Sequence, residues 1–528
     1  HSIECFPMRL LTILLAVPFF GTDSYKILVY NSKFGHSHST FLGQIADILV
    51  DAGHNVTSLL PILDTSLRDG TEKSHKIHVQ PDPVVKAFYE NQEAVNFFDM
   101  DMFSPIAPFI VSSMFANNFG RTCKRVVEEP GLIEKLRSEQ FDVMITENYD
   151  ICGIGISHAI APKSVIAATS TFLFGPQFNE FGVETAVSYR HSLVMPSFDV
   201  HSFSSRIWNA ISEFVAFTMF RYPRYVVDGV LKERFGPDYP SITKQSGDVA
   251  YVLTNSDPLM DSAAPTLARV IEIPGIGAKI PKKLNEYWEA ILNRRSRTVL
   301  ISFGSVAKSV QMPAASKAGI LSAIRRFPEV TFIWKYEQLD DEFCSTQAST
   351  VSNLVMADWV PQVDILNHAN LSLFITHSGM GSTRETASLG VPGVFVPLFF
   401  DQPRNAAMME LNGLGRVFDK FKLHDADKFM KTIREVLENA KYKENAVRLS
   451  KMLANKPFSS QALLVKHVEF AAEFGASEAL KPQSLNMNII EYLNLDIMAL
   501  IGFVIFVVVY FIVFVLRATF IVRKHKIE

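Results

Sequence analysis

Short apolar runs alternate with longer amphipathic stretches along most of this chain. In the first half, apolar runs predict strands at 26–30, 55–60, 141–147 and 163–168, with helices between them. In the second half the alternation is more regular, and strands are expected at 298–302, 330–335, 354–357, 371–376 and 394–397. Strands that alternate with helices form a parallel sheet that is covered on both faces. The pattern therefore predicts an α/β fold with two such sheets.

A turn-forming stretch, Pro274–Gly277, separates the two halves. We therefore expect two doubly wound, Rossmann-like domains, 24–274 and 275–450, that face each other across a cleft. A return helix and a juxtamembrane segment are expected at 451–496. The helical pattern at 451–474 favours a helix that crosses back to the first domain.

Both ends of the chain carry targeting signals. The segment 1–23 combines a short apolar run with small residues, which is typical of a secretory signal peptide, although a buried first helix is an alternative. The segment 497–516 carries no charge, and its length of about 20 residues matches the hydrocarbon core of a bilayer. Basic residues in the tail 517–528 predict a cytosolic tail and lumenal domains. Lys524 and Lys526 resemble a dilysine signal for retrieval to the endoplasmic reticulum, although they can also simply anchor the helix end.

The composition narrows the class of partner. A net charge of −3 gives no reason to expect nucleic acid. The chain has 42 Phe against 4 Trp, and the Phe-rich and Met-rich segments 90–119 and 172–220 are interpreted as helices that line an apolar pocket. Of the 4 Cys, one lies in the expected signal peptide, and the other three fit neither a disulfide framework nor a zinc site. The sequons at Asn55 and Asn370 fall in expected strands, so we expect little glycosylation there.

The strongest chemical signal lies between residues 359 and 405, in the motifs W-V-P-Q, T-H-S-G-M-G-S-T-R-E and D-Q-P-R-N. These motifs follow predicted strands, and loops at the carboxyl ends of parallel strands form the ligand site in such folds. The candidate binding residues are Ser305, Trp359, Gln362, His377, Gly379, Gly381, Ser382, Glu385, Asp401 and Gln402.

The first of these motifs suits a nucleoside. Trp359 can offer a flat face to uracil, and stacking of a base on an aromatic ring is worth about 1–3 kcal/mol. Gln362 can bond the uracil edge or a ribose hydroxyl. Glu385, about one turn into a predicted helix, can accept hydrogen bonds from both ribose hydroxyls.

The remaining residues suit a diphosphate and a sugar. His377 is followed by a loop in which Gly379 and Gly381 let the backbone approach a phosphate, and the loop opens a helix whose N-terminus attracts negative charge. This attraction grows as a nucleotide diphosphate departs, so it lowers the barrier. Ser305 is expected near a phosphate, and Asp401 and Gln402 are expected near sugar hydroxyls. Together the motifs predict a site for a UDP-sugar.

These motifs resemble the signature of the UDP-glycosyltransferase family, which includes the membrane-bound UDP-glucuronosyltransferases. The predicted signal peptide, single C-terminal span and dilysine tail are similar to those of its animal members. The resemblance implies a GT-B fold, with a nucleotide sugar on the second domain and an acceptor on the first. It also implies no permanently bound cofactor, UDP-glucuronate or UDP-glucose as donor, and oligomers with like or related chains as one option.

The resemblance further implies a catalytic base soon after the first strand. The matching residue is His38 in F-G-H-S-H-S, with His36 as the competitor. The family orients this base with an acidic residue after a later strand, usually Asp. Here Glu147 stands at that position, and Asp150 is the alternative.

Two departures from the family pattern concern the sugar. Many members that use glucuronate carry an Arg where Leu253 stands here, and Gly381–Ser382 replaces a larger residue followed by Gly. A sugar carboxylate without a partner is costly to desolvate, so glucose is a serious alternative donor. Asp99 and Asp101 form a D-x-D pattern that binds metal in a different glycosyltransferase fold. They lie far from the signature, so no metal is expected.

The sequence thus predicts an enzyme that transfers a sugar from a UDP-sugar to a hydroxyl of a small lipophilic acceptor, with inversion. The first expectation for the activity is a UDP-glucuronosyltransferase, and a UDP-glucosyltransferase is the alternative. A nucleotide-sugar epimerase or hydrolase and an inactive homologue that regulates active enzymes are the other hypotheses.

Overall fold

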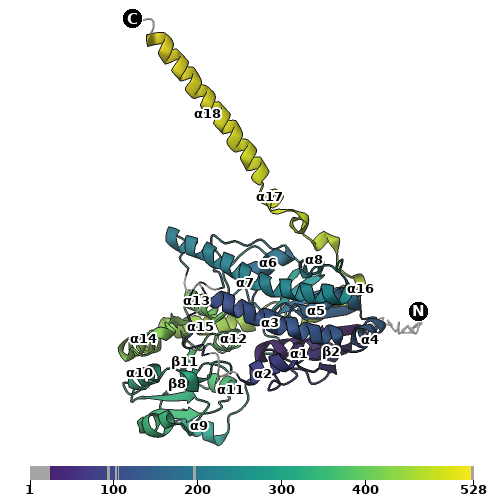
Figure 1. Ribbon diagram of the computed structural model, residues 1–528. Coiled ribbons are helices and arrows are strands. Elements are labelled where there is room, and N and C mark those ends of the chain that lie inside the picture. Colours follow the sequence, from purple (N-terminus) through teal and green to yellow (C-terminus); the bar gives the residue numbers. More distant parts are fainter. Residues whose placement is uncertain are drawn as a thin grey trace, which may run out of the picture.

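The computed structural model describes residues 24–91, 96–101, 104, 106–193, 195 and 198–524. Its body contains two parallel sheets flanked by helices, and one long helix projects from it (Figure 1). The strand orders are β3-β2-β1-β4-β5-β6-β7 and β10-β9-β8-β11-β12-β13. Counted within each domain, both follow the order 3-2-1-4-5-6 of a doubly wound sheet. The predicted α/β fold with two Rossmann-like domains is confirmed.

The first sheet contains more strands than the sequence pattern indicated. Its strands are β1 (Lys26–Tyr30), β2 (Asn55–Pro61), β3 (His75–Val79), β4 (Val143–Glu147), β5 (Ser164–Thr169), β6 (Tyr251–Thr254) and β7 (Val270–Glu272). The strands β3, β6 and β7 were not predicted. β3 is largely polar and only partly buried, and β7 has only three residues, so neither leaves a clear apolar run.

Alternation along β1 shows how this sheet is buried on both faces. Ile27 and Val29 pack on the face covered by α1 (His36–Asp51) and α16 (Ser460–Phe474). Leu28 and Tyr30 pack on the opposite face, against residues of α3 and α5. Because neither face meets water, the strand reads as a continuous apolar run.

The other helices of the first domain include one that is unusually long. They are α2 (Pro83–Glu90), α3 (Ala107–Glu128), α4 (Leu132–Ser138), α5 (Cys152–Ile160), α6 (Gly175–Phe181), α7 (Phe203–Phe235) and α8 (Ile242–Gly247). α3 and α7 lie side by side (Figure 1). Parts of the Phe-rich segments are thus helical, as predicted.

The second domain has the five strands that were predicted and one, β13, that was not. Its strands are β8 (Arg297–Ser302), β9 (Val330–Lys335), β10 (Leu354–Ala357), β11 (Leu371–Thr376), β12 (Gly393–Phe395) and β13 (Gly415–Val417). Its helices are α9 (Glu286–Leu292), α10 (Ala314–Ile324), α11 (Gln362–Leu366), α12 (Met380–Ser388), α13 (Gln402–Leu411) and α14 (Ala426–Glu438).

The expected return helix is two helices. α15 (Ala440–Ala454) belongs to the second domain and packs against α12, whereas α16 packs against α1 and strands of the first sheet. The break between them contains Pro457, whose ring cannot continue a helix. The chain does cross back to the first domain, as predicted, but it turns between the two helices to do so.

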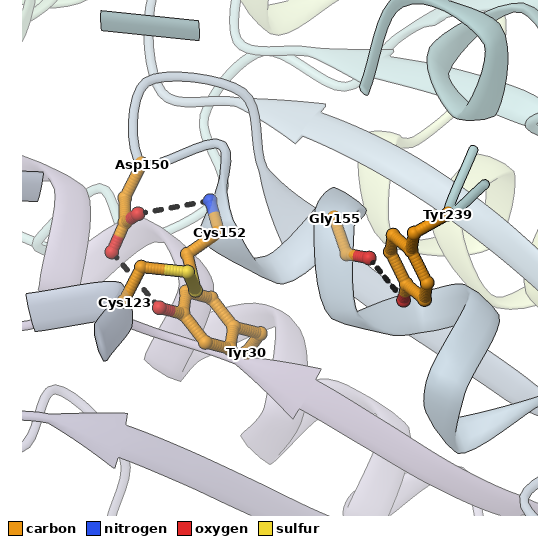
Figure 2. The surroundings of a disulfide bond; sticks show 6 residues. All are labelled: Tyr30, Cys123, Asp150, Cys152, Gly155 and Tyr239. Carbon is orange, nitrogen blue, oxygen red and sulfur yellow. Dashed lines mark hydrogen bonds between the residues drawn. A yellow bond between two sulfur atoms is a disulfide. The ribbon is translucent and has the colours of Figure 1, made fainter. Parts of the chain in front are cut away.

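Cys123 in α3 and Cys152 at the start of α5 form a disulfide (Figure 2). The prediction that the cysteines form no disulfide was therefore wrong. The pair is separated by 29 residues and meets because α3 packs against α5. Both cysteines are fully buried, and Cys344 is free and buried.

The last helix, α18 (Leu495–Lys524), leaves the body after the short helix α17 (Ile489–Tyr492) (Figure 1). Its segment Leu495–Thr519 has a mean hydropathy of 3.2 and is long and apolar enough to cross a membrane. It includes the predicted span 497–516. The predicted signal peptide, 1–23, and Lys526 of the dilysine pattern lie outside the described residues.

Candidate functional site

Four of the predicted site residues lie where the strand order of each sheet reverses. In the first sheet this point lies between β1 and β4, and His38 and Glu147 stand at the carboxyl ends of these strands. In the second sheet it lies between β8 and β11, which are followed by Ser305 and His377. Ligands bind at this position in doubly wound folds because the loops on either side diverge there.

His38 lies in the first turn of α1, and its Nδ1 faces two polar groups. Ser170 Oγ is 2.7 Å from this nitrogen, and Glu147 Oε2 is 3.4 Å from it. Glu147 is almost fully buried, and its Oε1 accepts a hydrogen bond from the backbone N–H of Ser170 at 3.4 Å. The Tyr149 ring packs edge-on against the imidazole at 4.8 Å. With Nδ1 held in this way, Nε2 is the nitrogen left for a substrate.

The two alternatives from the sequence are placed differently. His36 is exposed at the start of α1. Asp150 is fully buried, and it accepts hydrogen bonds from the Tyr30 hydroxyl at 3.0 Å and the Cys152 N–H at 3.1 Å (Figure 2). Burial raises the pKa of Asp150 to about 6. This carboxyl therefore supports the start of α5 and the disulfide, and the contact with His38 is made by Glu147.

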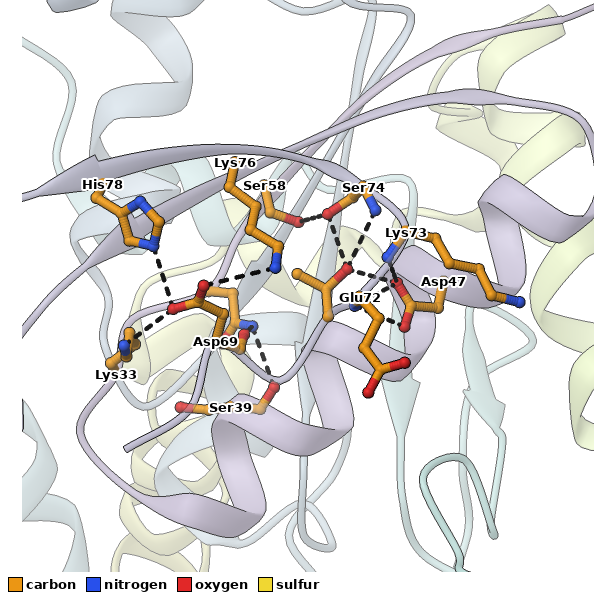
Figure 3. Close-up of polar contacts among 12 residues, drawn as sticks. Lys33, Ser39, Asp47, Ser58, Asp69, Glu72, Lys73, Ser74, Lys76 and His78 are labelled. Carbon is orange, nitrogen blue, oxygen red and sulfur yellow. Dashed lines mark hydrogen bonds and ion pairs between the residues drawn. The ribbon is translucent and has the colours of Figure 1, made fainter. Parts of the chain in front are cut away.

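A polar cluster next to β3 fixes the position of α1 (Figure 3). Asp47 in α1 accepts hydrogen bonds from the backbone N–H groups of Glu72 and Lys73, each at 3.0 Å. Helix and loop meet backbone to backbone, since a Cβ added to Gly43 would lie 2.1 Å from the carbonyl carbon of Gly70. The helix that carries His38 is therefore held against the loop before β3.

Trp359 follows β10 and is 65% exposed, so its face is open to a ligand. Lys335, the last residue of β9, lies with its Nζ 5.7 Å from the centre of this ring. The same Nζ donates a hydrogen bond to the Gly304 carbonyl at 2.7 Å and pairs with Glu337 at 3.2 Å. A buried positive charge thus lies between the exposed indole and the loop after β8.

His377 follows β11 and fits between two glycines. A Cβ on Gly304 would lie 2.7 Å from its Cε1, and a Cβ on Gly379 would lie 2.6 Å from its Nε2. Burial, reinforced by the nearby Lys335, lowers the pKa of His377 to about 4. The ring is therefore neutral at pH 7 and can offer a phosphate an N–H but no positive charge.

The start of α12 carries the next group. Gln362 Nε2 donates to Glu385 Oε2 at 2.6 Å and to Ser382 Oγ at 3.3 Å. Burial raises the pKa of Glu385. Gly381 is exposed at the helix N-terminus, and a Cβ there would meet nothing within 4 Å. Ser305, also exposed, lies in the loop after β8.

Asp401 and Gln402 begin α13 and have different surroundings. Asn405 Nδ2 donates to Asp401 Oδ2 at 2.7 Å and to the Ser378 carbonyl at 3.1 Å, which links the Asp401 loop to the His377 loop. Gln402 is buried, and its Oε1 accepts the N–H groups of Leu398 and Phe399. That oxygen therefore supports the loop.

The two domains meet at the catalytic candidates. His38 and Asp401 are close enough for the imidazole to lower the pKa of this carboxyl, although burial raises it by more. Aromatic rings continue the contact, since Phe34 packs on His38 at 4.4 Å and Phe115 of α3 stacks on Phe400 at 5.4 Å. Phe400 has a φ of 51°, a conformation that non-glycine residues rarely adopt. This end of the site is therefore aromatic and contains residues of both domains.

Lys420 fastens the two domains together. Its Nζ donates to the carbonyls of Phe97 and Met100 in the first domain, at 2.7 and 2.6 Å, and to Leu398 in the second, at 2.9 Å. Burial lowers the pKa of Lys420 to about 8, while Asp99 and Asp101 raise it. The two carboxylates of the D-x-D pattern thus interact electrostatically with Lys420. Among the described residues, no group of three or more His, Cys, Asp or Glu is arranged to hold a metal.

Comparison with known proteins assigns the family. Residues 25–527 match the family model described as UDP-glucoronosyl and UDP-glucosyl transferase. The chain is a UDP-glycosyltransferase. It is 30% identical over 496 residues to a putative UDP-glucuronosyltransferase, ugt-48, of Caenorhabditis elegans, covering 92% of this chain and 93% of that protein. It is 26% identical over 491 residues to UDP-glucuronosyltransferase 1A7 of Rattus norvegicus, covering 88% of each.

Solved structures agree on the fold of this UDP-glycosyltransferase. A UDP-glucosyltransferase from Polygonum tinctorium has a TM-score of 0.56 at 14% identity, covering 86% of this chain and 99% of that one. The glycosyltransferase of kitacinnamycin has a TM-score of 0.57 at 15% identity, covering 87% and 100%. At these identities the likeness establishes the GT-B fold alone.

The sequence analysis missed several residues of the candidate site. Ser170 and Lys335 both stand at the carboxyl end of a strand, after β5 and in β9, so the rule that pointed to His377 would also have found them. Asn405 lies one helical turn after Asp401, and that spacing was visible too. Lys420 carried no local signal, because its partners in the first domain lie more than 300 residues earlier.

Proposed function

We propose that this UDP-glycosyltransferase transfers glucose from UDP-glucose to a hydroxyl of a small lipophilic acceptor, with inversion at the anomeric carbon. The choice of glucose over glucuronate rests on the charges around Asp401. The basic side chains that act on this carboxyl are those of His38 and Arg404. His38 is the proposed base, so Arg404 is the candidate partner for a sugar carboxylate.

Arg404 is already engaged. Its guanidinium is buried, pairs with Asp261, donates from Nε to the His191 carbonyl at 3.2 Å, and lies 3.7 Å from the centre of the Phe172 ring. A glucuronate carboxylate would have to displace Asp261 and would also lie near Asp401. A neutral hexose meets neither cost, and this observation carries the preference for glucose.

Leu253 stands at the position where an Arg was expected to mark the use of glucuronate. Leu253 is fully buried in β6 and packs in the core cluster that also contains residues of α1 and α16. Its identity is therefore a matter of packing in this chain.

The proposed chemistry follows from the contacts of His38. Its Nε2 takes the proton of the acceptor hydroxyl, whose oxygen attacks the anomeric carbon while the bond to UDP breaks. Glu147 stabilises the imidazolium that forms, and Ser170 holds the ring orientation. The amides at the α12 N-terminus and the Lys335 ammonium stabilise the departing diphosphate. The aromatic rings around His38 favour a flat, lipophilic acceptor.

The location proposed is the endoplasmic reticulum membrane, with both domains in the lumen. The apolar segment Leu495–Thr519 supports an anchor, and Arg517 and later basic residues support a cytosolic tail. The disulfide between Cys123 and Cys152 supports an oxidising compartment, because such bonds are rare in the cytosol.

The test compares donors. Full-length enzyme in detergent is given radiolabelled UDP-glucose or UDP-glucuronate with a panel of phenols, and kcat/KM is measured for each donor. We expect a preference for UDP-glucose of at least tenfold, and a preference for UDP-glucuronate would overturn the proposal. The variant Asp261→Asn, which weakens the grip on Arg404, should shift the ratio toward UDP-glucuronate.

The same assay separates the rival functions. Consumption of UDP-sugar at the full rate without acceptor would indicate an epimerase or a hydrolase. Binding of UDP-sugar without transfer to any acceptor would favour an inactive regulatory homologue. A His38→Ala enzyme that kept near-normal turnover would remove the proposed base.

A further inference from the structure

The long helix α7 carries an apolar stripe on its solvent side. We call the following residues the α7 stripe: Phe203, Ile207, Ile211, Phe214, Tyr222 and Tyr225. Their spacing of three, four and eight residues places them on one face of the helix. All six are exposed, and the exposed fraction is 73% for Phe203, 68% for Phe214 and 75% for Tyr225.

A second face of α7 packs into the protein core. Ala216, Met219 and Phe220 are buried there and pack toward the rest of the first domain. A helix that is apolar on both faces needs a partner on each. The α7 stripe therefore lacks a partner within the described residues.

The start of α3 extends this surface. Ser112 Oγ donates to the Met219 carbonyl at 2.7 Å and Arg234 Nε donates to the Val127 carbonyl at 3.0 Å, so α3 and α7 run in the same direction. This register places the first turn of α3 near Phe214. Ile106, immediately before that turn, is 65% exposed, and both Phe109 and Ile110 are 57% exposed.

The segment from Lys481 to Leu495, which we call the tether, connects the first domain to the proposed membrane anchor α18 and keeps this surface near it. Lys481 pairs with Asp248, and Leu485 packs against Gly182 and Gly247, so the chain is attached to the first domain up to this point. The step from Leu485 to Leu495 spans at most ~35 Å even when fully extended. Within it, α17 exposes Ile489 (65%) and Ile490 (51%).

The arrangement of helices puts the tether and the stripe on neighbouring elements. α6 packs against α7 and also against the segment Gln483–Asn486 of the tether. In Figure 1, α6, α7 and α8 lie on the side of the body nearest α17, and α9 lies at the far end.

The charges along the stripe also suit a membrane surface. Between Phe203 and Tyr225 the helix has one carboxylate, Glu213, whose Oε1 lies against Gly175 of α6. Arg206 and Arg221 are the cations that flank the stripe. Aromatic and aliphatic residues next to arginines are typical of helices that lie in the bilayer interface.

We propose that the α7 stripe, with the start of α3, rests in the interface of the same bilayer that holds α18. The enzyme would then contact the membrane at two places. If the proposed function holds, this places the acceptor-binding domain against the lipid that contains lipophilic acceptors.

The experiment uses the full-length chain in phospholipid vesicles, with the photo-crosslinker p-benzoylphenylalanine at Phe214. The matched control carries it at Tyr287 of α9, which is 57% exposed at the far end of the body. We expect at least tenfold more adduct with radiolabelled phospholipid at Phe214 than at Tyr287. Equal lipid labelling at the two positions would overturn the proposal, and so would adducts at Phe214 to a second copy of the chain or another protein in place of lipid.

A second measurement asks whether the stripe itself makes the contact. With the crosslinker at Tyr225, the substitutions Ile207→Ser and Ile211→Ser should lower lipid labelling several-fold. Thermal stabilisation by UDP, which binds the other domain, reports that each variant is folded. Unchanged labelling at Tyr225 in a folded variant would show that the anchor alone brings lipid to this face, and the proposal would fail. The comparison of Phe214 with Tyr287 stands even if this variant does not fold.

Discussion

Replacing the buried carboxylate beside the proposed base tests the proposed mechanism most directly. In Glu147→Gln the side chain keeps its size but loses its charge, so His38 loses the group that stabilises its protonated form. Glu147 Oε2 lies 3.4 Å from His38 Nδ1, and the side chains are 2% exposed for Glu147 and 16% for His38.

The expected loss can be worked out from this distance. A full charge on the imidazole would be stabilised by about 5 kcal/mol at 3.4 Å and an effective dielectric constant of about 20. If about half the charge has developed in the transition state, the loss is about 2.5 kcal/mol, or about 70-fold in kcat. The KM for the UDP-sugar should change little, because Glu147 lies in the other domain.

The assay is steady-state glucosyl transfer at saturating donor, with the melting temperature measured to confirm folding. The matched control is Asp150→Asn, which removes a nearby buried carboxyl that contacts Tyr30 instead of the base. Asp150→Asn is expected to lower stability more than kcat. A Glu147→Gln enzyme within threefold of wild-type kcat would refute the reasoning, and so would a well-folded Asp150→Asn enzyme with the larger kcat loss.

Three further predictions concern the donor site, the carboxyl group of Glu272 and the disulfide. Gly379→Ala puts a methyl group 2.6 Å from the His377 imidazole, so the affinity for UDP, measured by calorimetry, should fall at least tenfold. Gly381→Ala adds a methyl group where nothing lies within 4 Å, so this control should bind UDP normally. Equal losses of affinity in the two variants would contradict a role for the close fit of Gly379 against His377. Burial raises the pKa of Glu272 to about 7, so its folded-state pKa lies above the unfolded value of 4.5, and its contribution to stability is complete below pH 4.5 and lost as the pH rises through 7. Glu272→Gln should therefore flatten the fall in melting temperature between pH 5 and 8, and an unchanged slope would count against this assignment. Replacing Cys123 and Cys152 with Ala removes a crosslink over 29 residues and should cost about 3–4 kcal/mol of unfolding free energy in urea titrations, while a loss under about 1 kcal/mol would mean that the unfolded chain is barely constrained by it.

The parts of the site that the sequence revealed are those set by strand ends. His38, Glu147, His377 and Asp401 each follow a run of apolar residues, and parallel packing brings the ends of such runs to one edge. The contact between His38 and Glu147 thus follows from the topology alone. Their roles as base and orienting acid remain predictions.

What the sequence did not reveal depends on packing between distant segments. The bond between Cys123 and Cys152 needs α3 to lie against α5, and nothing in either segment specifies that contact. Lys420 reads as an ordinary surface lysine until the loop around Phe97 is placed beside it. The break at Pro457, in contrast, was visible in the sequence as a proline inside an expected helix.

The hydrogen bonds of Lys420 to both domains bear on the entry and release of substrates. Beside it, the Phe97 ring stacks on Phe399 at 4.1 Å, and Phe98, only 4% exposed, packs on Phe303. Separating the domains would expose Phe98 to water at a cost of about 2 kcal/mol. It would also break hydrogen bonds between the Lys420 ammonium and backbone carbonyls. The resting enzyme is therefore biased toward its shut form. Opening the cleft far enough to release nucleotide would therefore separate two aromatic pairs and break the hydrogen bonds that Lys420 donates to Phe97 and Met100.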